Sequence, residues 1–344
     1  MASRAPLSDL YHQMVKMRRF EEALGNLWLA GLISGEMHLG IGEEGIAAGV
    51  LAHLESDDGL ALDHRPTPAL VGSGVDIETM TLEMLGSEDG LCRGRGGHMH
   101  LFDPGHMAAS SGIVGASAPL ACGFALANLR LRPGRIAVAF FGESALNQGM
   151  TMEAMNLAAV WKLPVLFVVK DNGWAITTSS RKMTGGSIHK RAAGLGVPSS
   201  KVAGDDVAAV WKVAGKAVGR LRRGAGPQLI HATCKRPRGH FENDPLIEMV
   251  NDPIGSTSEI TGIVRGLADS GGSGPGARLA GAGAVTKTAL RMAWHLRGPA
   301  RDPLERAAGR LDPQQREGLL EDAAGEVDQA VASALKRAGM SWPS

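Results

Sequence analysis

The chain has 344 residues, of which 44% are hydrophobic, so it can bury a large core and disorder is not expected. Lys and Arg number 36 against 35 for Asp and Glu, which argues against the broad positive field of a nucleic-acid-binding protein. Three cysteines without a CxxC pair argue against a disulfide scaffold or zinc knuckle and favour a reducing cytoplasm, and the apolar runs are too short to cross a membrane. We therefore expect a small-molecule substrate or a protein partner.

Helical and strand-like segments alternate along the first two thirds of the chain. The predicted elements are an amphipathic helix over 8–31, a small-residue helix over 112–129, a strand over 135–142, a helix over 150–162, a strand over 164–172, a helix over 205–223 and a strand over 227–234. Strand–helix–strand units of this kind cross over right-handedly in parallel sheets. The fold class predicted is α/β, with a doubly wound, mostly parallel sheet flanked by helices.

The last third has a different composition. Gly, Ala and Ser dominate residues 270–284, where we expect a flexible loop or linker, and helix-forming residues return from Pro303 to about Arg337. The expected parts are a ligand-binding domain over 1–254, a Gly/Ala/Ser-rich insertion or loop over 255–301 and a C-terminal helical segment over 302–344.

Polar residues follow two of the predicted strands at the carboxyl edge of the sheet, where parallel sheets bind ligands. Glu143 follows the first strand and Asn172 ends the second, and the crossover between them returns both to one edge. Carboxylate and amide oxygens are ligands that Mg²⁺ or Ca²⁺ prefers. Gly142 permits a tight turn, and the amides of Ser144 and Ala145 open the next helix, where anionic oxygen is favoured. The pattern predicts a metal–phosphate site.

Several blocks of the sequence resemble one family. GESALNQG (142–149), EAMNLAAVWKLP (153–164) and DNGW (171–174) look like the thiamine diphosphate signature of alpha subunits of 2-oxoacid and acetoin dehydrogenases. Further blocks, in family order, are HLGIGEEG (38–45), LCRGRGGHMHL (91–101) and SGIVGASAPLACGFALA (111–127). The resemblance implies the thiamine diphosphate-binding fold, with thiamine diphosphate and Mg²⁺, or Ca²⁺, as cofactors.

The resemblance also implies site residues. The metal would be bound by Glu143, Asn172 and the backbone carbonyl of Trp174. The residues expected to bind the cofactor are Gly112 and Val114 at the aminopyrimidine, Gly142, Ser144 and Ala145 at the diphosphate, and Arg236 and His240 near the diphosphate and the reacting centre. His64 matches a second active-site histidine, so His64 and His240 are the expected catalytic residues.

The activity implied is cleavage of a 2-oxoacid or an acetoin-like hydroxyketone, with transfer of the acyl fragment to an acceptor. In the family this acceptor is a lipoyl-bearing acyltransferase, and a beta subunit supplies the glutamate that activates the pyrimidine, in an alpha2-beta2 assembly. Two alternatives stay open: a diverged carboligase or decarboxylase without a lipoyl partner, and a non-catalytic scaffold paralogue.

The sequence departs from the family pattern near the expected site. Glu143-Ser144 replaces the usual Asp-Gly, Lys170 stands for a Glu and Asp171 for an Asn. A Tyr-Arg pair that grips the diphosphate in the family aligns with Ala61-Leu62, for which Arg65 and Arg95 are the nearby substitutes. His98 and His100 form an HxH pair for which we favour a structural role, since no third ligand is evident. The helix of EAMNLAAVWK is expected to form core and subunit interface.

Overall fold

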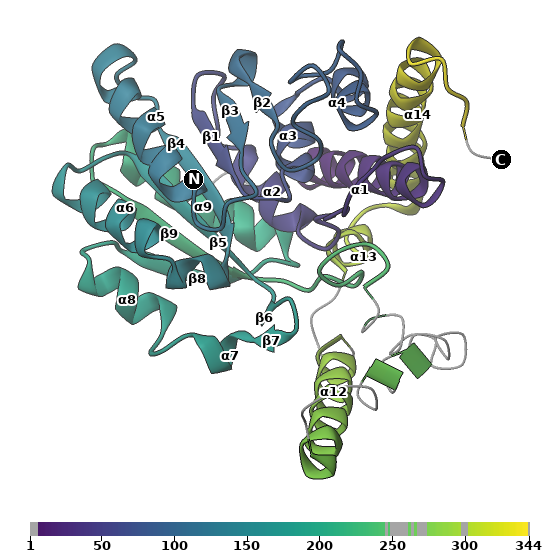
Figure 1. Cartoon of the computed structure of the whole chain (residues 1–344). Coiled ribbons are helices and arrows are strands. Elements are labelled where there is room, and N and C mark those ends of the chain that lie inside the picture. The colour runs from purple at the N-terminus through teal and green to yellow at the C-terminus, as the bar shows by residue number, and fades with distance from the viewer. Residues whose placement is uncertain are drawn as a thin grey trace.

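The computed structural model describes residues 6–244, 247, 261, 262, 265, 266, 274–296 and 302–342. Its strands are β1 (Gly59–Leu62), β2 (Phe102–Asp103), β3 (Ala108–Ser110), β4 (Ala137–Gly142), β5 (Val165–Asp171), β6 (Trp174–Ala175), β7 (Thr178–Ser179), β8 (Ser199–Ala203) and β9 (Gln228–Thr233). Seven of them form one sheet in the order β2-β3-β1-β4-β5-β9-β8, in which only the β2–β3 pair is antiparallel (Figure 1). The predicted fold class is confirmed.

The described helices are α1 (Leu7–Leu29), α2 (Glu44–Leu51), α3 (Thr67–Ser73), α4 (Ile77–Met84), α5 (Ser117–Leu131), α6 (Gly149–Val160), α7 (Ser180–Met183), α8 (Ile188–Gly194), α9 (Val207–Arg222), α12 (Pro275–Leu296), α13 (Pro303–Ala308) and α14 (Pro313–Arg337), with short 3-10 turns η1 (Pro104–His106) and η2 (Glu143–Asn147). Several of them cover the two faces of the sheet, whereas α12 extends away from it (Figure 1). All seven elements predicted before residue 235 are present within a few residues of their expected bounds.

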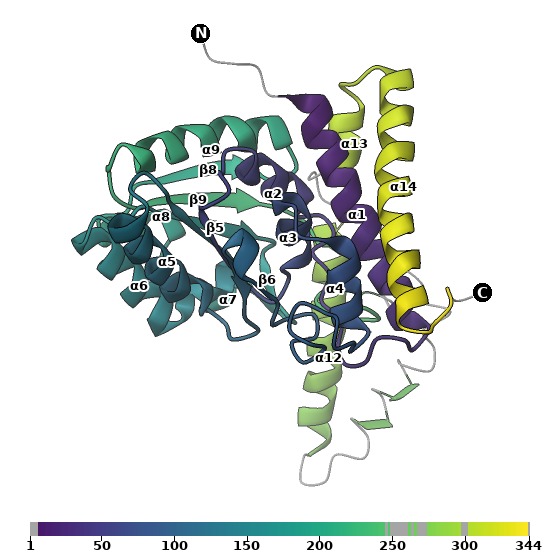
Figure 2. The same cartoon turned by 90° about the horizontal axis from the view of Figure 1, so that it is seen from above.

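Alternate side chains of the central strands build two separate cores. Val138 and Phe140 of β4 pack into a cluster with residues of α1, α2 and α9, whereas Ala139 and Phe141 pack into a second cluster with residues of α5 and α6. Figure 2 shows these two groups of helices on opposite faces of the sheet. Strands buried on both faces read as continuous apolar runs, which is why β4 and β5 are evident in the sequence.

The C-terminal helices return to the start of the chain. Helix α14 lies alongside α1 (Figure 2), and Arg19 of α1 makes a bidentate pair with Asp328 of α14 at 2.9 and 2.8 Å. The preceding residue, Arg18, bridges Glu44 of α2, at 2.5 Å, and Asp302, the N-cap of α13, at 2.9 Å. These pairs join the C-terminal segment to the helix layer that covers the sheet.

The expected loop over 270–284 is wrong from Pro275 onward, because those residues form the first half of α12. Alanine has the highest helix propensity and alternates here with the glycines, and proline suits the first turn of a helix. Residues 254, 255 and 301 at the predicted divisions lie outside those described, so the division stays a prediction. Within the described ranges, no helix combines the length and apolar content of a membrane span.

Candidate active site

The ends of β4 and β5 bring the two expected metal-binding side chains to one edge. These strands are parallel neighbours, with Gly142 opposite Lys170, so Glu143 and Asn172 both emerge at the carboxyl edge of the sheet. Both residues are buried, at 3% and 6% exposure. Burial raises the pKa of Glu143, and the hydroxyl of Ser180, which donates a hydrogen bond to its Oε1, opposes that shift. A buried carboxylate and a buried amide side chain therefore lie at the same edge of the sheet, and their role as metal ligands stays a prediction.

The loop after β5 is held in place on both sides. Asp171 accepts a hydrogen bond from the Gly173 amide at 2.9 Å, and its other oxygen lies 2.6 Å from Nε2 of His231 on β9. The His231 hydrogen bond holds the pKa of Asp171 below its ordinary value in spite of burial. The hairpin of β6 and β7 then folds back, and the Ser180 amide donates to the Gly173 carbonyl at 2.9 Å. Ser180, which begins α7 directly after this hairpin, thereby contacts Glu143.

Four histidines gather beside this edge from four segments of the chain. The ring centroid of His38 lies 5.2 Å from that of His64, 5.3 Å from His98 and 5.0 Å from His240, and those of His64 and His240 are 5.6 Å apart. The two expected catalytic histidines are thus brought together. His38 was missed, and His98 joins this cluster through a contact of 3.1 Å between its Nε2 and Nδ1 of His38, whereas His100 is exposed.

Arg65 links two of the loops that carry these histidines. Its Nη1 donates to the Leu39 carbonyl at 2.6 Å, and its Nη2 donates to the His240 carbonyl at 2.5 Å and lies 3.3 Å from His240 Nδ1. A guanidinium has no acceptor atom, so Nδ1 of His240 is the acceptor in this pair. The neutral ring of His240 then carries its proton on Nε2, where it can donate to another group.

The cluster is a cationic environment in which the imidazoles stay neutral. Burial is the main cause, and Arg65 adds to it: the pKa values of His38 and His240 fall to about 3 and that of His98 to about 4, and that of His64 is also lowered. Burial together with Arg236 lowers the pKa of Arg65 itself to about 9. At neutral pH these rings can exchange hydrogen bonds without adding positive charge.

Two glycines allow the loops to approach one another closely. Gly42 has φ +98°, and a side chain there would meet the backbone carbonyl of Lys235. Gly239 has φ +81°, and a Cβ would lie 2.7 Å from the Asp244 carboxylate, which accepts a hydrogen bond from the His240 amide at 3.0 Å. Both positions require the left-handed backbone that glycine adopts at little cost.

The other residues expected at the cofactor lie around this edge. Gly112 and Val114 follow β3, which is parallel to β1, so they emerge on the carboxyl side, and Val114 is 52% exposed. Ser144 and Ala145 lie in η2 rather than at the start of an α-helix, because α6 begins only at Gly149. Trp174 begins β6, two residues beyond Asn172. Their contacts with a cofactor remain predictions.

The structure explains why the positions of the family's Tyr-Arg pair cannot bind the diphosphate here. Ala61 and Leu62 lie inside β1 and are fully buried in the two cores, so neither position opens toward the site. Arg65 is the third residue after this strand and is buried within the histidine cluster, whereas Arg95 is exposed. Of the two substitutes, the structure favours Arg65.

Unsatisfied polar atoms indicate what the site can accept. Nε of Arg65, Nε of Arg236 and Nε2 of His64 are buried without a hydrogen-bond partner among the described residues. Buried polar atoms are normally paired, and the two guanidinium nitrogens among these three are donors, so they indicate a place for an anionic or strongly polar ligand. The residues present therefore fit a metal-bound diphosphate: a carboxylate and an amide oxygen for the metal, and guanidinium groups for the phosphate oxygens.

Glu21 of α1 binds the loop that contains His38 and the start of α3, which follows the loop of His64 and Arg65. Its Oε1 accepts hydrogen bonds from Gly40 N at 2.9 Å and Thr67 Oγ1 at 2.5 Å, and burial raises its pKa to about 8. The folded protein thus keeps a proton that the unfolded chain releases above its ordinary pKa of about 4.5. The resulting stability is full below that value and is lost as the pH rises through the folded pKa.

We therefore expect wild-type stability to fall, relative to Glu21→Gln, by about 1.4 kcal/mol per pH unit between the two pKa values. The amide resembles the neutral carboxyl but does not titrate. Urea unfolding of both proteins at pH 5, 6, 7 and 8 measures this difference. Parallel stability profiles would show that Glu21 is already ionised in the folded protein.

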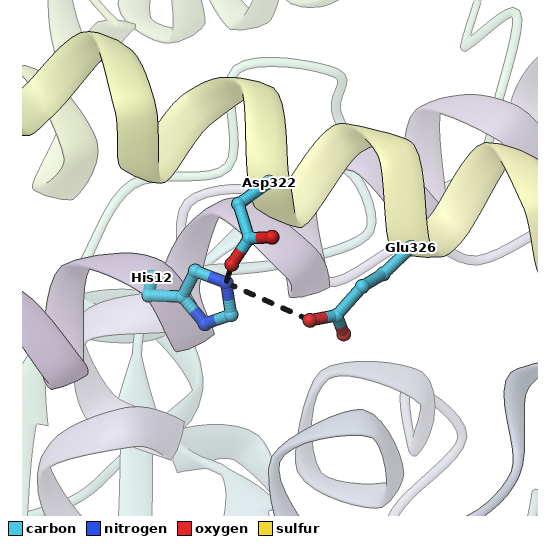
Figure 3. Close-up of side chains that lie close together, drawn as sticks. All are labelled: His12, Asp322 and Glu326. Carbon is cyan, nitrogen blue, oxygen red and sulfur yellow. Dashed lines mark hydrogen bonds and ion pairs between the residues drawn. The ribbon is translucent and has the colours of Figure 1, made fainter.

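One further group of metal-type side chains lies away from this edge. Nε2 of His12 is 3.1 Å from Asp322 Oδ2 and 3.9 Å from Glu326 Oε1, between α1 and α14 (Figure 3). The ammonium of Lys16 already pairs with Glu326, and the two carboxylates are largely exposed. We interpret this group as ion pairing between the two helices.

A parallel α/β sheet with buried metal-type oxygens, arginines and neutral histidines at its carboxyl edge defines the class of an enzyme subunit for an anionic cofactor. The family model described as "Dehydrogenase E1 component" matches residues 12–249. The alpha subunit of acetoin:2,6-dichlorophenolindophenol oxidoreductase from Cupriavidus necator is 42% identical over 240 residues, 69% of this chain and 72% of the relative. Its counterpart from Bacillus subtilis is 40% identical over 237 residues, 68% and 71% of the two chains.

The pyruvate dehydrogenase E1 component subunit alpha of Zymomonas mobilis is 38% identical over 258 residues, 73% of each chain. The chain belongs to the dehydrogenase E1 component family. This confirms the family that the motifs indicated, the alpha subunits of thiamine diphosphate-dependent 2-oxoacid and acetoin dehydrogenases.

Proposed function

We propose that this chain binds thiamine diphosphate through Mg²⁺ and, with a beta subunit, cleaves a 2-oxoacid or an acetoin-like hydroxyketone. Glu143, Asn172 and the carbonyl of Trp174 bind the metal, for which Ca²⁺ is a possible substitute. Arg65 and Arg236 bind the diphosphate. The observation that carries the proposal is the convergence of Glu143 and Asn172 with unpaired buried guanidinium nitrogens at one sheet edge.

The remaining expected contacts complete this proposal. The amides of Ser144 and Ala145, next to the turn at Gly142, face the diphosphate, and the backbone at Gly112 and Val114 borders the aminopyrimidine. The cofactor, when bound, supplies the carbanion and the electron sink for carbon–carbon cleavage.

The histidines act on the substrate side. His240 presents a proton on Nε2, because its Nδ1 faces Arg65, and it donates to the oxygen of the reacting carbonyl. His64 has a buried Nε2 without a partner among the described residues and is the second group that can hold or move a proton. Their neutral state at physiological pH suits both tasks, since a neutral imidazole can donate at one nitrogen and accept at the other.

Exposed apolar side chains support a partner subunit. Ile113 and Val114 are 62% and 52% exposed beside the site, and Trp161 is 52% exposed at the end of α6. A groove between α5 and α6 is lined by Leu126, Leu129, Arg130, Trp161 and Leu163. Large apolar residues exposed together mark interaction surfaces. We assign this face to assembly with the beta subunit, in an alpha2-beta2 enzyme whose other half supplies the pyrimidine-activating glutamate.

Calorimetry tests the proposal. Titration of thiamine diphosphate with Mg²⁺ into the chain and its beta partner should give saturable binding that is lost without the metal. No binding at millimolar cofactor would exclude an enzyme and leave the scaffold paralogue.

We propose the cytoplasm as the compartment of this chain, because its three cysteines are free thiols and a reducing compartment keeps thiols in that state.

The acyl acceptor is a separate question. We propose a lipoyl-bearing acyltransferase, and transfer of a labelled acyl group to a purified lipoyl domain tests it. Turnover without such transfer would favour a carboligase or decarboxylase instead.

A further inference from the structure

Lys170 is a buried cation that the proposed chemistry does not use. It lies near the end of β5, and its side chain is 7% exposed. The family pattern has a glutamate at this position. Its ammonium is 2.7 Å from Glu43 Oε2 and 3.1 Å from Asp63 Oδ1. The side chains of those two acids are 3% and 12% exposed. One cation therefore compensates two largely buried carboxylates.

Both carboxylates belong to segments that carry the histidine cluster. Asp63 Oδ1 also accepts a hydrogen bond from the Arg65 amide at 3.1 Å, which fixes the turn containing His64. The amide of Glu43 donates to the Gly40 carbonyl at 2.9 Å. This hydrogen bond connects Glu43 to the loop that contains His38. Lys170 itself is two residues before Asn172. The ammonium is thus a junction between the strand of the metal site and two histidine loops.

The geometry balances charge around this ammonium, because it lies between two largely buried carboxylates. Burial opposes ionisation of Glu43, yet Lys170 and the nearby arginines keep its pKa below its ordinary value. Removal of one partner from a buried ion pair leaves an uncompensated charge, which is far costlier than removal of both.

We propose that Lys170 is a positioning residue that holds the segments of His38, His64 and Arg65 against the strand of Asn172, so that the metal and diphosphate ends of the site are assembled before the cofactor binds. The proposal rests on the proposed function. A glutamate at this position would place three carboxylates together, so the residue of the family pattern cannot be restored here alone.

Hydrogen exchange of the purified chain without cofactor tests this role. In Lys170→Met we expect the amides of 38–43 and 63–65 to exchange at least about tenfold faster than in the wild type. The dissociation constant for thiamine diphosphate with Mg²⁺ should rise by about 10- to 100-fold, the range for residues that support a metal site from outside. Lys170→Arg keeps the cation and should stay within about threefold of the wild type. Lys216→Met, at an exposed position of α9, is the matched control.

A double variant separates charge from packing. Lys170→Met with Glu43→Gln removes one of the two uncompensated carboxylates, so it should regain part of the protection and affinity, and it serves as the test if the single variant does not fold. Unchanged exchange in Lys170→Met, or no rescue in the double variant, overturns the positioning role. If the wild type binds no thiamine diphosphate, the proposed function fails, whereas the exchange data still decide the role of Lys170.

Discussion

Glu143→Gln should weaken Mg²⁺-dependent binding of thiamine diphosphate by more than about 100-fold while the protein stays folded. Residues that only support a metal ligand already contribute about 10- to 100-fold, and Glu143 is proposed as the ligand itself. The amide keeps the shape and can still accept the Ser180 hydrogen bond, but it lacks the charge that a hard divalent cation requires. Burial has already raised the pKa of this carboxyl, so an uncharged replacement is tolerated.

Calorimetry and thermal unfolding together check this expectation. Glu153→Gln, exposed on α6 ten residues later, is the matched control and should bind like the wild type. Glu143→Asp restores the family's usual residue and keeps the charge, so it should still bind. Wild-type affinity in Glu143→Gln would mean that the metal is held elsewhere.

Asp58→Ala should lower the free energy of unfolding by about 3–5 kcal/mol, the cost of removing one partner from a buried charge pair. The carboxylate is 2% exposed and lies directly before β1. It accepts hydrogen bonds from the amides of Ile136 and Glu55, both at 2.8 Å, and from Arg222 at 2.6 Å. One side chain thus joins the starts of β1 and β4 to the end of α9.

This clamp sits at the edge of the sheet opposite the site, so the variant should keep its cofactor affinity under conditions in which it remains folded. Urea unfolding provides the measurement. Asp57→Ala is the control, because the Asp57 side chain is 49% exposed and its loss should change stability by less than about 0.5 kcal/mol. A loss below about 1 kcal/mol in Asp58→Ala would show that the clamp contributes little.

The parts of the fold that the sequence predicts are those with strong local patterns. Strands β4 and β5 are apolar runs that end in polar residues, and the single crossover between them places Glu143 and Asn172 at one edge. Strand β1 has only four residues and β8 is half exposed, so neither has a clear period. The start of α12 resembles a loop in composition because glycines alternate with its alanines, yet these residues are helical.

The histidine cluster depends on contacts between distant loops, which the sequence alone does not predict. His38, His98 and the ammonium of Lys170 acquire their roles only when loops far apart in sequence meet. Arg65 was a candidate because it lies near the expected anchors. The burial of Ala61 and Leu62 within β1 shows why the charge must come from the loop after the strand. A buried charged residue next to a recognised motif is the signal that can find such sites in advance.

The return of α14 to α1 bears on how this chain tolerates its extra segment. Asp302 is anchored to Arg18, and Arg306 pairs with Asp205 at 2.7 Å, so the chain is fixed again directly after residue 301. The insertion predicted over 255–301 therefore ends where the chain is held in place. Closing a flexible loop costs only about 0.6 kcal/mol more for each doubling of its length. The length of such a segment can therefore change in evolution with little effect on folding stability, and the segment can acquire a separate function.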